Sequence, residues 1–272
     1  MIKAMDTIAL SQQAIERRLD PAMSALIEVH VCDSVGSTND AVVDLGPLSE
    51  GKTRALLAEE QTLGRGRRGR QWQSPHGANL YCSVAWQFAG PLAALGGLSL
   101  AVGADIAGAV AERFGVELDL KWPNDLYHNG RKLGGILVEV KGEGHAGHQC
   151  VIGMGVNVRM PDKLGAGIDK PWVDFSSILG AQVDRNDLAA AILSRVVPGL
   201  FRFARQGLAP WLPVWAGRDF LCGRKVVVDG QPPITGIATG VDANGALLVD
   251  TIEGRVAVAG GEASLIEIGE PA

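Results

Sequence analysis

The distribution of hydrophobic and polar residues along the chain predicts a mixture of strands and helices. Short apolar runs bounded by polar residues or glycine are typical of strands. They occur at residues 26–32, 55–59, 80–88, 117–122, 134–141 and 149–158. Helical composition and spacing predict helices at residues 11–19, from the polar turn 33–40 toward Leu45, at 97–114, and at 187–206 with a continuation to Trp215.

The pattern changes near Phe220. From Gly223 onward the apolar runs are short and strand-like, at residues 225–228, 235–240, 246–250 and 256–259, and Asp-Gly and Asn-Gly turns separate them. This spacing is typical of a small β-barrel or sandwich. We therefore expect a short N-terminal helical segment at 1–25, a main domain at 26–219 and a small C-terminal β-domain at 220–272.

The strongest single turn signal is Asn129-Gly130 within residues 127–130, which predicts a hairpin between the strands at 117–122 and 134–141. At the N-terminus, Ser11 can cap the first helix and Asp20-Pro21 can end it.

Composition indicates an ordinary globular protein. The chain has 272 residues, 47% of them hydrophobic, and a net charge of −5 from 25 basic and 30 acidic side chains. A broad nucleic-acid-binding face would need a basic excess. The four cysteines are far apart, so reduced thiols in the cytoplasm are expected.

We expect no signal peptide and no membrane span. Residues 92–110 come closest to a span, but they are interrupted by glycines and Asp105, which indicates a buried helix.

Residues 64–70, GRGRRGR, concentrate four arginines and three glycines on this acidic chain. Glycine allows the main chain to approach a ligand closely, and arginine offers a planar fork to phosphate or carboxylate. The segment therefore predicts a local anionic ligand. For an arbitrary stretch rich in arginine and glycine, a solvated basic turn is the favoured interpretation.

Three further segments and a polar patch have the same double interpretation. Residues 121–125 (KWPND) place a cation, an amide and a carboxylate at a strand end, residues 131–136 (RKLGGI) place cations before two glycines, and residues 153–157 (GMGVN) interrupt a strand with glycine. Residues 37–39 (STN) can cap a helix or contact a ligand. No Walker-type phosphate loop, no Gly-x-Ser-x-Gly and no histidine spacing typical of a metal site occurs.

In combination and in this order, GRGRRGR followed by Trp72, then SPHGANLY, KWPNDL, RKLGGILVE and GMGVNV resemble the biotin–protein ligase family. The resemblance runs from about residue 33 through the C-terminal domain. It implies an α+β fold, with a mixed β-sheet and helices of the class II synthetase-like biotin–lipoate ligase type. It also implies that the C-terminal domain is a small SH3-like β-barrel.

The resemblance implies ATP-dependent ligation of biotin to a lysine of a biotin carboxyl carrier domain. Biotin and ATP are the implied substrates, with Mg²⁺ accompanying ATP, and biotinyl-5′-adenylate is the implied intermediate. The enzyme would hold two anions together and stabilise charge at the α-phosphate.

The same resemblance implies roles for individual residues. Lys132, Arg67 and Asp125 would be catalytic: Lys132 would bridge the biotin carboxylate and the phosphate, and Asp125 would help the carrier lysine lose its proton. The implied biotin-binding residues are Ser37, Thr38, Asn39, Gln61, Gly64, Arg65, Arg67, Arg68, Lys132, Gly134 and Gly135, with Gly66 giving a further main-chain contact. The implied ATP- or adenylate-binding residues are Arg67, Arg68, Arg70, Trp72, Asn124, Lys132 and Asn157, Asn157 toward the adenine. No resident metal site is expected.

The chain departs from the family pattern in two places. Family members that repress transcription carry an N-terminal winged helix-turn-helix domain, whereas here a short helical segment precedes the first core strand, so a monofunctional enzyme without DNA binding is expected. Ile266 stands where the family has an arginine, which puts an ATP contact from the C-terminal domain in doubt. We expect a cytoplasmic monomer or homodimer that does not bind membranes.

Two other functions compete. A lipoate or octanoate–protein ligase would share the fold but not GRGRRG together with KWPND. An RNA-binding protein could use the arginine-glycine loop and Trp72, but the acidic net charge argues against it.

Overall fold

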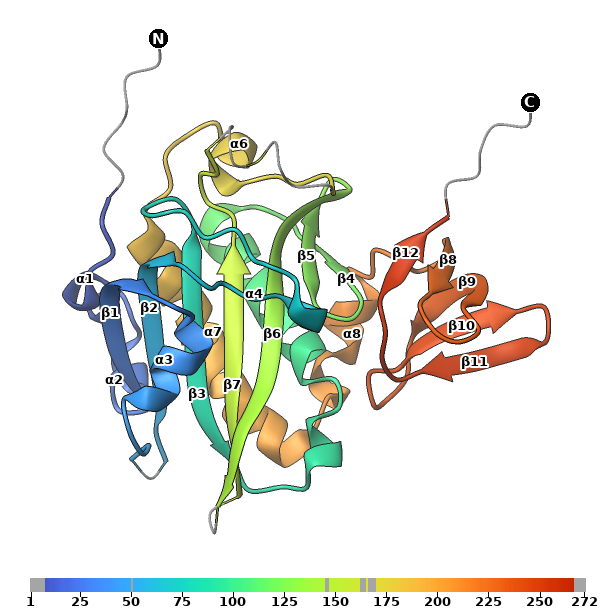
Figure 1. Ribbon diagram of the computed structural model, residues 1–272, viewed down its shortest axis with the longest axis horizontal. Coiled ribbons are helices and arrows are strands. Elements are labelled where there is room, and N and C mark those ends of the chain that lie inside the picture. The colour runs from blue at the N-terminus through green and yellow to red at the C-terminus, as the bar shows by residue number, and fades with distance from the viewer. Residues whose placement is uncertain (1–7, 50, 145–146, 162–164, 166–169, 267–272) are drawn as a thin grey trace.

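The computed structural model describes residues 8–49, 51–144, 147–161, 165 and 170–266. Its main element is a seven-stranded sheet with the order β1-β2-β3-β7-β6-β5-β4 (Figure 1). The strands are β1 (Ile27–Val35), β2 (Thr53–Gln61), β3 (Leu80–Phe88), β4 (Asp119–Lys121), β5 (Asp125–His128), β6 (Arg131–Gly144) and β7 (Gly147–Val156). β1 and β2 are parallel and every other pair in this sheet is antiparallel. The predicted mixed sheet with helices is therefore confirmed.

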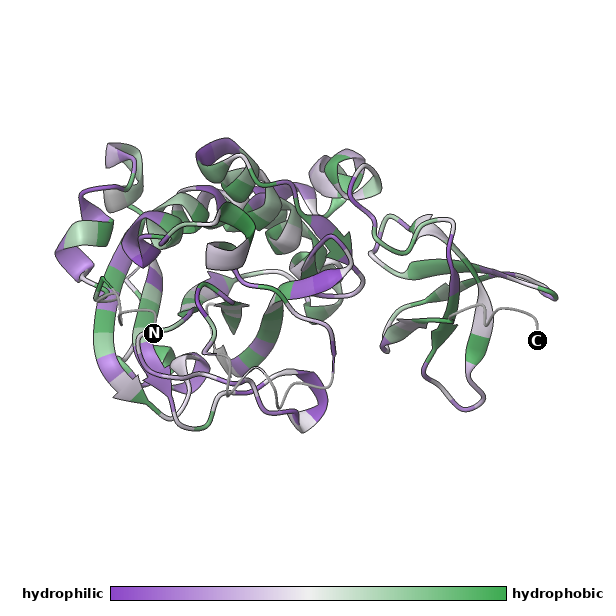
Figure 2. Ribbon diagram, turned by 90° about the horizontal axis from the view of Figure 1, so that it is seen from above, coloured by the Kyte–Doolittle hydropathy of each residue, from purple (hydrophilic) through white to green (hydrophobic). Residues whose placement is uncertain are grey.

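Two long helices cover one face of this sheet. α4 (Leu98–Phe114) and α7 (Arg185–Gln206) pack on each other, α4 also contacts β6, and α7 contacts β3. The shorter α3 (Thr38–Asp44) lies on the opposite face over β2, β3 and β7. Figure 2 shows helices along one side of the curved main sheet and the C-terminal strands set apart from it.

Side-chain alternation along the strands divides the core between these two faces. Leu57 of β2 belongs to the large cluster under α4 and α7, whereas its neighbour Leu56 packs with Val42 of α3. Because successive strand residues point to opposite faces, the same rule places Ser83, Gly153 and every second residue around them on the α3 face. That face carries the polar residues discussed below.

The C-terminal unit is an antiparallel sheet of five strands in the order β11-β10-β9-β8-β12. Its strands are β8 (Lys225–Val228), β9 (Ile234–Val241), β10 (Leu247–Thr251), β11 (Gly254–Val258) and β12 (Ala263–Leu265). Four of them match the predicted runs closely, and β12 lies in a segment for which no strand was predicted. Asp242 accepts backbone hydrogen bonds from Asn244 and Ala246 across the β9–β10 turn.

At the N-terminal side, α1 (Gln12–Glu16) and α2 (Pro21–Ser24) pack against α7 and β1. Ser11 caps α1 through a hydrogen bond from Ala14 N, as predicted, and Asp20 caps α2, which was not predicted. Further helical elements in the described segments are α6 (Phe175–Leu179), α8 (Leu212–Ala216) and the short 3₁₀ turns η1 (Arg67–Gly69), η2 (Leu92–Leu95) and η3 (Ala209–Trp211).

Two element predictions were wrong in detail. Tyr127 and His128 belong to β5, a strand that the sequence analysis missed, so the hairpin turn is Asn129-Gly130 alone, with φ of 48° and 74°. α7 does not continue to Trp215: it ends at Gly207, whose φ of 59° is incompatible with further helix, and η3 and α8 follow separately.

The expectation that no stretch is long and apolar enough to span a membrane was also wrong as stated. Leu92–Phe114 meets that requirement by length and composition alone. The chain is interrupted there, because Gly97 has a φ of 77° and separates η2 from α4. Most residues of α4 are buried against the sheet and α7, as predicted for a core helix.

Candidate active site

A cavity of about 550 Å³ opens on the α3 face of the main sheet. The start of α3, the arginine-glycine loop (residues 64–70), the first half of β6, the end of β7 and the edge of the C-terminal sheet line it. A volume of this size falls within the range of sites for small-molecule ligands and cofactors.

One end of the cavity is an uncharged hydrogen-bonding cluster. Gln61 Oε1 accepts hydrogen bonds from both the backbone N and the hydroxyl of Thr38, at 2.9 and 3.0 Å. Ser83 Oγ lies 2.7 Å from Thr38 Oγ1 and 2.6 Å from Asn39 Oδ1. Ser37, Thr38 and Asn39 are buried, so this end holds several donors and acceptors away from bulk water. Such a cluster suits a small ligand with both kinds of groups.

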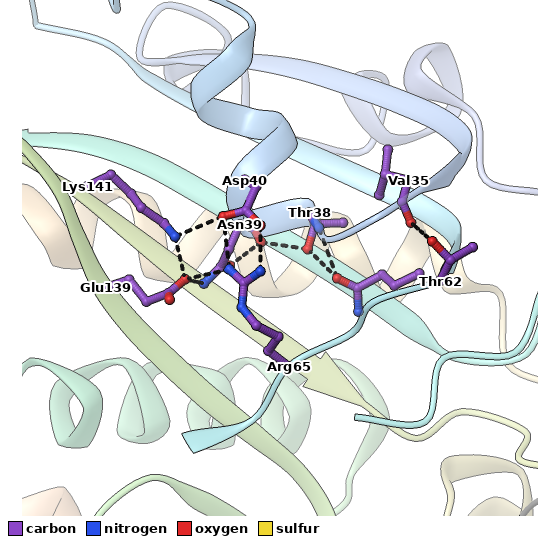
Figure 3. A network of polar contacts seen from close by, with 10 residues as sticks. Val35, Thr38, Asn39, Asp40, Thr62, Arg65, Glu139 and Lys141 are labelled. Carbon is purple, nitrogen blue, oxygen red and sulfur yellow. Dashed lines mark hydrogen bonds and ion pairs between the residues drawn. The ribbon is translucent and has the colours of Figure 1, made fainter. Parts of the chain in front are cut away.

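A ring of four charged side chains, Asp40, Arg65, Glu139 and Lys141, contacts this cluster through Asn39 (Figure 3). Asn39 Nδ2 donates to Glu139 Oε2 at 2.7 Å, which orients the Asn39 carbonyl toward Ser83. Lys141 bridges Glu139 and Asp40 at 3.1 and 2.9 Å. Burial raises the pKa of Glu139, but the hydrogen bond from Asn39 and the nearby Lys141 outweigh it, so the net shift is downward and the carboxylate stays ionised.

Arg65 belongs to this ring. Its guanidinium donates to both oxygens of Asp40 and lies 3.4 Å from Glu139, and the hydrogen bond from Arg65 is the main reason that the pKa of Asp40 is lowered. Arg65 therefore ties the start of the arginine-glycine loop to α3. Its predicted contact with biotin remains a prediction.

Glycines form the floor of the cavity, where β3, β7 and β6 run side by side. Gly153 pairs with Ser83 on one side, and a Cβ built on it would overlap Asn39 Oδ1. A Cβ on Gly155 would lie 2.6 Å from the Trp72 indole. The indole Nε1–H of Trp72 is buried and has no hydrogen-bond partner among the described residues. Such an unsatisfied donor beside a cavity marks a place for a ligand acceptor.

The centre of the cavity contains an ion pair. Lys132 Nζ lies 2.7 Å from Asp125 Oδ1 and 5.5 Å from the centre of the Trp72 ring. Gly135 is adjacent: a Cβ there would be 3.4 Å from Asp125 Oδ1 and 3.6 Å from Lys132 Nζ. Lys132, Asp125 and Trp72 were all predicted as site residues, and the fold brings them together.

The four arginines of the loop have different partners. Arg68 pairs with Asp229 at 2.6 Å, and Arg70 pairs with Glu262, so both reach the C-terminal domain. Arg68 itself adopts a left-handed backbone, with φ of 57°, which is unusual for a residue other than glycine.

Arg67 is the arginine whose charge is least compensated. It donates to Gly261 O at 3.1 Å and Asn124 Oδ1 at 3.4 Å, and it has no carboxylate partner in the described part of the chain. Its pKa is lowered, first by burial and then by Arg68 and Arg70. Arg67 therefore presents a partly desolvated cation to the cavity.

The two asparagines predicted on the nucleotide side donate hydrogen bonds from their side chains to backbone carbonyls. Asn124 Nδ2 donates to Ile136 O at 2.7 Å while its Oδ1 faces Arg67. Asn157 is buried in the cavity wall and its Nδ2 donates to Val173 O at 3.2 Å. One of the two amide N–H groups of Asn157 is thus used by Val173, which leaves the side-chain carbonyl and the second N–H for a ligand.

Two predicted glycines do not line the cavity. A Cβ on Gly64 would lie 2.6 Å from Trp72 O, and one on Gly134 would lie 2.6 Å from Gly155 O. These positions require glycine because backbone segments approach closely there, so a direct ligand contact from either is not supported. Gly66, by contrast, lines the cavity.

The C-terminal domain reaches the cavity, although not through Ile266. Ile266 donates its backbone N–H to Lys225 O and does not line the cavity, but Asp229, Glu262 and Ser264 of the same domain do. The C-terminal domain therefore contributes to the site through carboxylates that contact the arginine-glycine loop.

Several residues of the site were missed. Glu139 and Lys141 could have been found from the period-two pattern of β6, which places them on the same face as Gly135. Lys170 approaches Glu262, and Trp172 lines the cavity, but both come from a segment with no recognisable motif. Lys121 was noticed as part of a motif and not assigned a role.

Together, the mixed sheet and a cavity with an uncharged polar end and a cationic end fit an enzyme that binds small anionic substrates. Comparison with protein families identifies the class further: residues 31–157 match the biotin/lipoate A/B protein ligase family, and residues 221–266 match the biotin protein ligase C-terminal domain.

Individual proteins similar to this chain are ligases as well. The bifunctional ligase/repressor BirA of Escherichia coli (strain K12) is 39% identical over 244 residues, which cover 89% of this chain and 73% of that protein. The biotin–[acetyl-CoA-carboxylase] ligase of Mycobacterium tuberculosis is 31% identical and is covered over 94% of its length. Among solved structures, the biotin protein ligase of Aquifex aeolicus in complex with biotin and ATP has a TM-score of 0.74 at 28% identity, covering 88% of this chain and 98% of that chain. The chain belongs to the biotin protein ligase family.

Proposed function

We propose that this enzyme joins biotin to a lysine of a biotin carboxyl carrier domain through biotinyl-5′-adenylate, with ATP and its Mg²⁺ as co-substrate. The observation that carries this proposal is the polarity of the cavity. Buried Thr38 and Asn39 line one end, where Ser83 hydrogen-bonds both of them, and Arg67 and Lys132 line the cationic side. A ureido ring and a carboxylate joined by an aliphatic chain match these two ends.

In the first step, an oxygen of the biotin carboxylate attacks the α-phosphorus of ATP, and the bond to the β-phosphate oxygen breaks to release pyrophosphate. Two anions must approach each other, so cations that span both reduce their repulsion. Lys132 and Arg67 are the side chains proposed for this role. Arg67 has no carboxylate partner in the described chain, and Lys132 lines the cavity together with its carboxylate partner Asp125.

In the second step, the neutral amine of the carrier lysine attacks the acyl carbon and AMP leaves. The attacking ammonium must first lose a proton. Asp125 is proposed to assist, since its carboxylate lies 2.7 Å from Lys132 Nζ at the centre of the cavity.

The polar end of the cavity also argues against lipoate or octanoate as the substrate. Those acids have apolar heads, which can neither donate hydrogen bonds to nor accept them from the buried polar groups of Thr38 and Asn39 in the cavity wall. The ureido ring of biotin can do both.

One assay tests the function. The purified enzyme is incubated with ATP, Mg²⁺ and a biotin carboxyl carrier domain, together with labelled biotin or labelled lipoate. We expect biotin label on the carrier, dependent on ATP, with pyrophosphate released. Lipoate transfer without biotin transfer would disprove the proposal.

The proposal extends to the cellular location of the enzyme, its binding partners and the fold of its C-terminal domain. A cytoplasmic location is supported by the four free cysteines, two of them buried. The net charge of −5 supports an enzyme that binds neither DNA nor anionic membranes. A monomer or homodimer is proposed as its working form. Within the C-terminal sheet, β8 pairs with β12, and these are its first and last strands in sequence order. This pairing supports an SH3-like barrel.

A further inference from the structure

Lys121, the last residue of β4, is a buried cation that forms no ion pair with any residue in the described part of the chain. Its exposed fraction is 8%, and it lines the cavity. Its one hydrogen-bond contact among the described residues is Tyr127 Oη at 3.5 Å, at the limit of a hydrogen bond. Burial raises the pKa of Tyr127 to about 12, so this phenol carries no negative charge that could compensate the lysine.

The nearby carboxylates are already engaged. Asp125 favours the charged form of Lys121, but its Oδ1 lies 2.7 Å from Lys132 Nζ. Glu262 pairs with both Arg70 and Lys170. Burial, and then the charges of Lys170, Lys132 and Arg70, lower the pKa of Lys121 to about 8. An ammonium buried without a counter-ion is costly, so its retention at a cavity wall points to a ligand that supplies the charge.

The balance of charge in the cavity indicates the kind of ligand. Seven cationic side chains and three carboxylates line it within the described residues. Of these cations, Arg65 and Arg68 pair with Asp40 and Asp229 at the two sides of the loop. The remaining excess of positive charge matches a polyphosphate better than one carboxylate.

The position of Lys121 in the sheet indicates which phosphate it faces. The uncharged end of the cavity lies over β3 and β7, Lys132 lies on β6, and β4 is the edge strand beyond β5. Lys121 is therefore on the far side of Lys132 from the end proposed to hold the biotin ring. A triphosphate whose α-phosphate meets Lys132 would extend its other two phosphates in that direction.

We propose that Lys121 binds the β- and γ-phosphates of ATP and stabilises pyrophosphate as it leaves, a role that rests on the function proposed above. Lys121 is thus a substrate-binding residue of the first step only. Once pyrophosphate has left, the adenylate no longer contacts it, and transfer to the carrier proceeds without it.

The test is Lys121→Met, which keeps the length of the side chain and removes its charge. Biotin-dependent ATP–pyrophosphate exchange gives the KM for MgATP and for pyrophosphate. Both are expected to rise about 10- to 100-fold, as for loss of one charge-assisted hydrogen bond. Transfer to the carrier from added biotinyl-adenylate and the affinity for biotin should stay within about twofold of wild type.

Lys225→Met is the matched control, because Lys225 is exposed on β8 and does not line the cavity. It should change neither KM. Thermal unfolding separates a binding role from a structural one: Lys121→Met should be as stable as wild type or more stable, since it removes an uncompensated buried charge.

Unchanged KM values for ATP and pyrophosphate in a folded Lys121→Met variant would overturn the inference. Loss of transfer from added adenylate would also overturn it, because that result would place Lys121 at the acyl or α-phosphate group. If wild type itself showed no biotin-dependent exchange, the proposed function would fail, and this outcome is distinct from a variant that matches an active wild type.

Discussion

At the scale of single residues, Lys132 is placed for electrostatic work rather than for stability. Its ion pair with Asp125 is partly open to solvent, with side chains 24% and 18% exposed, and the Trp72 ring covers one side. Exposed or half-exposed pairs of this kind contribute little to folding, about 0–1 kcal/mol.

Lys132→Ala should therefore lower the rate of biotin-dependent pyrophosphate release by about 100- to 1,000-fold, as for loss of one group that stabilises transition-state charge. The melting temperature should change little. Pyrophosphate release and thermal unfolding are measured on the same preparation. A folded variant with wild-type release would refute the proposed role.

Gly153 tests the uncharged end of the cavity. A Cβ at this position would overlap Asn39 Oδ1 and displace the amide from Ser83 and Glu139. Gly153→Ala should raise the KM for biotin about 10- to 100-fold, which corresponds to the 1–3 kcal/mol typical of overpacking, with less effect on the KM for ATP. Gly142→Ala, at a strand glycine with open space around it, is the matched control. Equal biotin KM values in both variants would argue against this site for the ring.

The arginines of the loop also differ at this scale. Arg65 contacts Asp40 and Glu139, Arg68 contacts Asp229, and Arg70 contacts Glu262, whereas Arg67 has no carboxylate partner in the described chain. The sequence of residues 64–70 alone cannot show which arginine lacks a carboxylate partner, because the partners come from α3, β6 and two loops of the C-terminal domain.

At the scale of elements, the packing of α4 on α7 contains one buried acid. Asp105 of α4 accepts a hydrogen bond from Trp211 Nε1 at 2.8 Å and lies close to Gly199 of α7, where a Cβ would overlap it. Burial raises the pKa of Asp105 to about 7 from an ordinary value of 3.8. The folded chain therefore retains this proton up to a higher pH than the unfolded chain.

The sign of the pH effect follows from this difference. The contribution of Asp105 to stability is fully present below about pH 4 and is lost as the pH rises through about 7, by at most about 4 kcal/mol at 1.4 kcal/mol per pKa unit. Asp105→Asn keeps an acceptor for Trp211 and does not titrate. Its free energy of unfolding should therefore fall less than that of wild type between pH 4 and pH 8.

Chemical denaturation at several pH values measures this. Glu112→Gln, an exposed acid on the same helix, should follow the wild-type curve within about 0.5 kcal/mol. Parallel pH curves for wild type and Asp105→Asn would contradict the raised pKa.

The element predictions were most accurate where local signals were strong. Residues 80–88 form β3 as predicted, and α4 ends at the predicted Phe114 before Gly115 in a left-handed conformation. β5 was missed because it is only four residues long and lies between two turns. The short β12 was missed because its pairing with β8 is a tertiary contact rather than a local pattern.

At the scale of the whole molecule, the C-terminal domain contacts the arginine-glycine loop through acids. Glu262 pairs with Arg70 and with Lys170, and Asp229 pairs with Arg68. These contacts join the two sheets across the mouth of the cavity. They also occupy cations that a nucleotide would use.

Glu262→Gln should loosen the loop in the absence of substrates. Its two ion pairs are partly exposed, so at about 0.2–1 kcal/mol each the opening equilibrium should rise about 2- to 30-fold. Hydrogen exchange of residues 64–71 measures this, and adding biotin and ATP should restore protection. Asp250→Asn, which removes an ion pair with Arg255 inside the C-terminal sheet, should leave the loop unchanged. Equal exchange in all three proteins would show that the ion pairs of Glu262 do not hold the loop.

The sequence alone determined the family, the alternation of helices and strands, the C-terminal β-domain and most of the chemistry-bearing residues, because motifs, turns and hydrophobic periods are local properties. Only the tertiary structure decided which residues share a cavity. It removed Gly64 and Gly134 from the lining and gave Arg65 a carboxylate partner, whereas Lys121 and Arg67 have none among the described residues. The reason is physical: the electrostatic state of a side chain depends on burial and on partners that are distant in sequence, and these exist only once the sheets have packed.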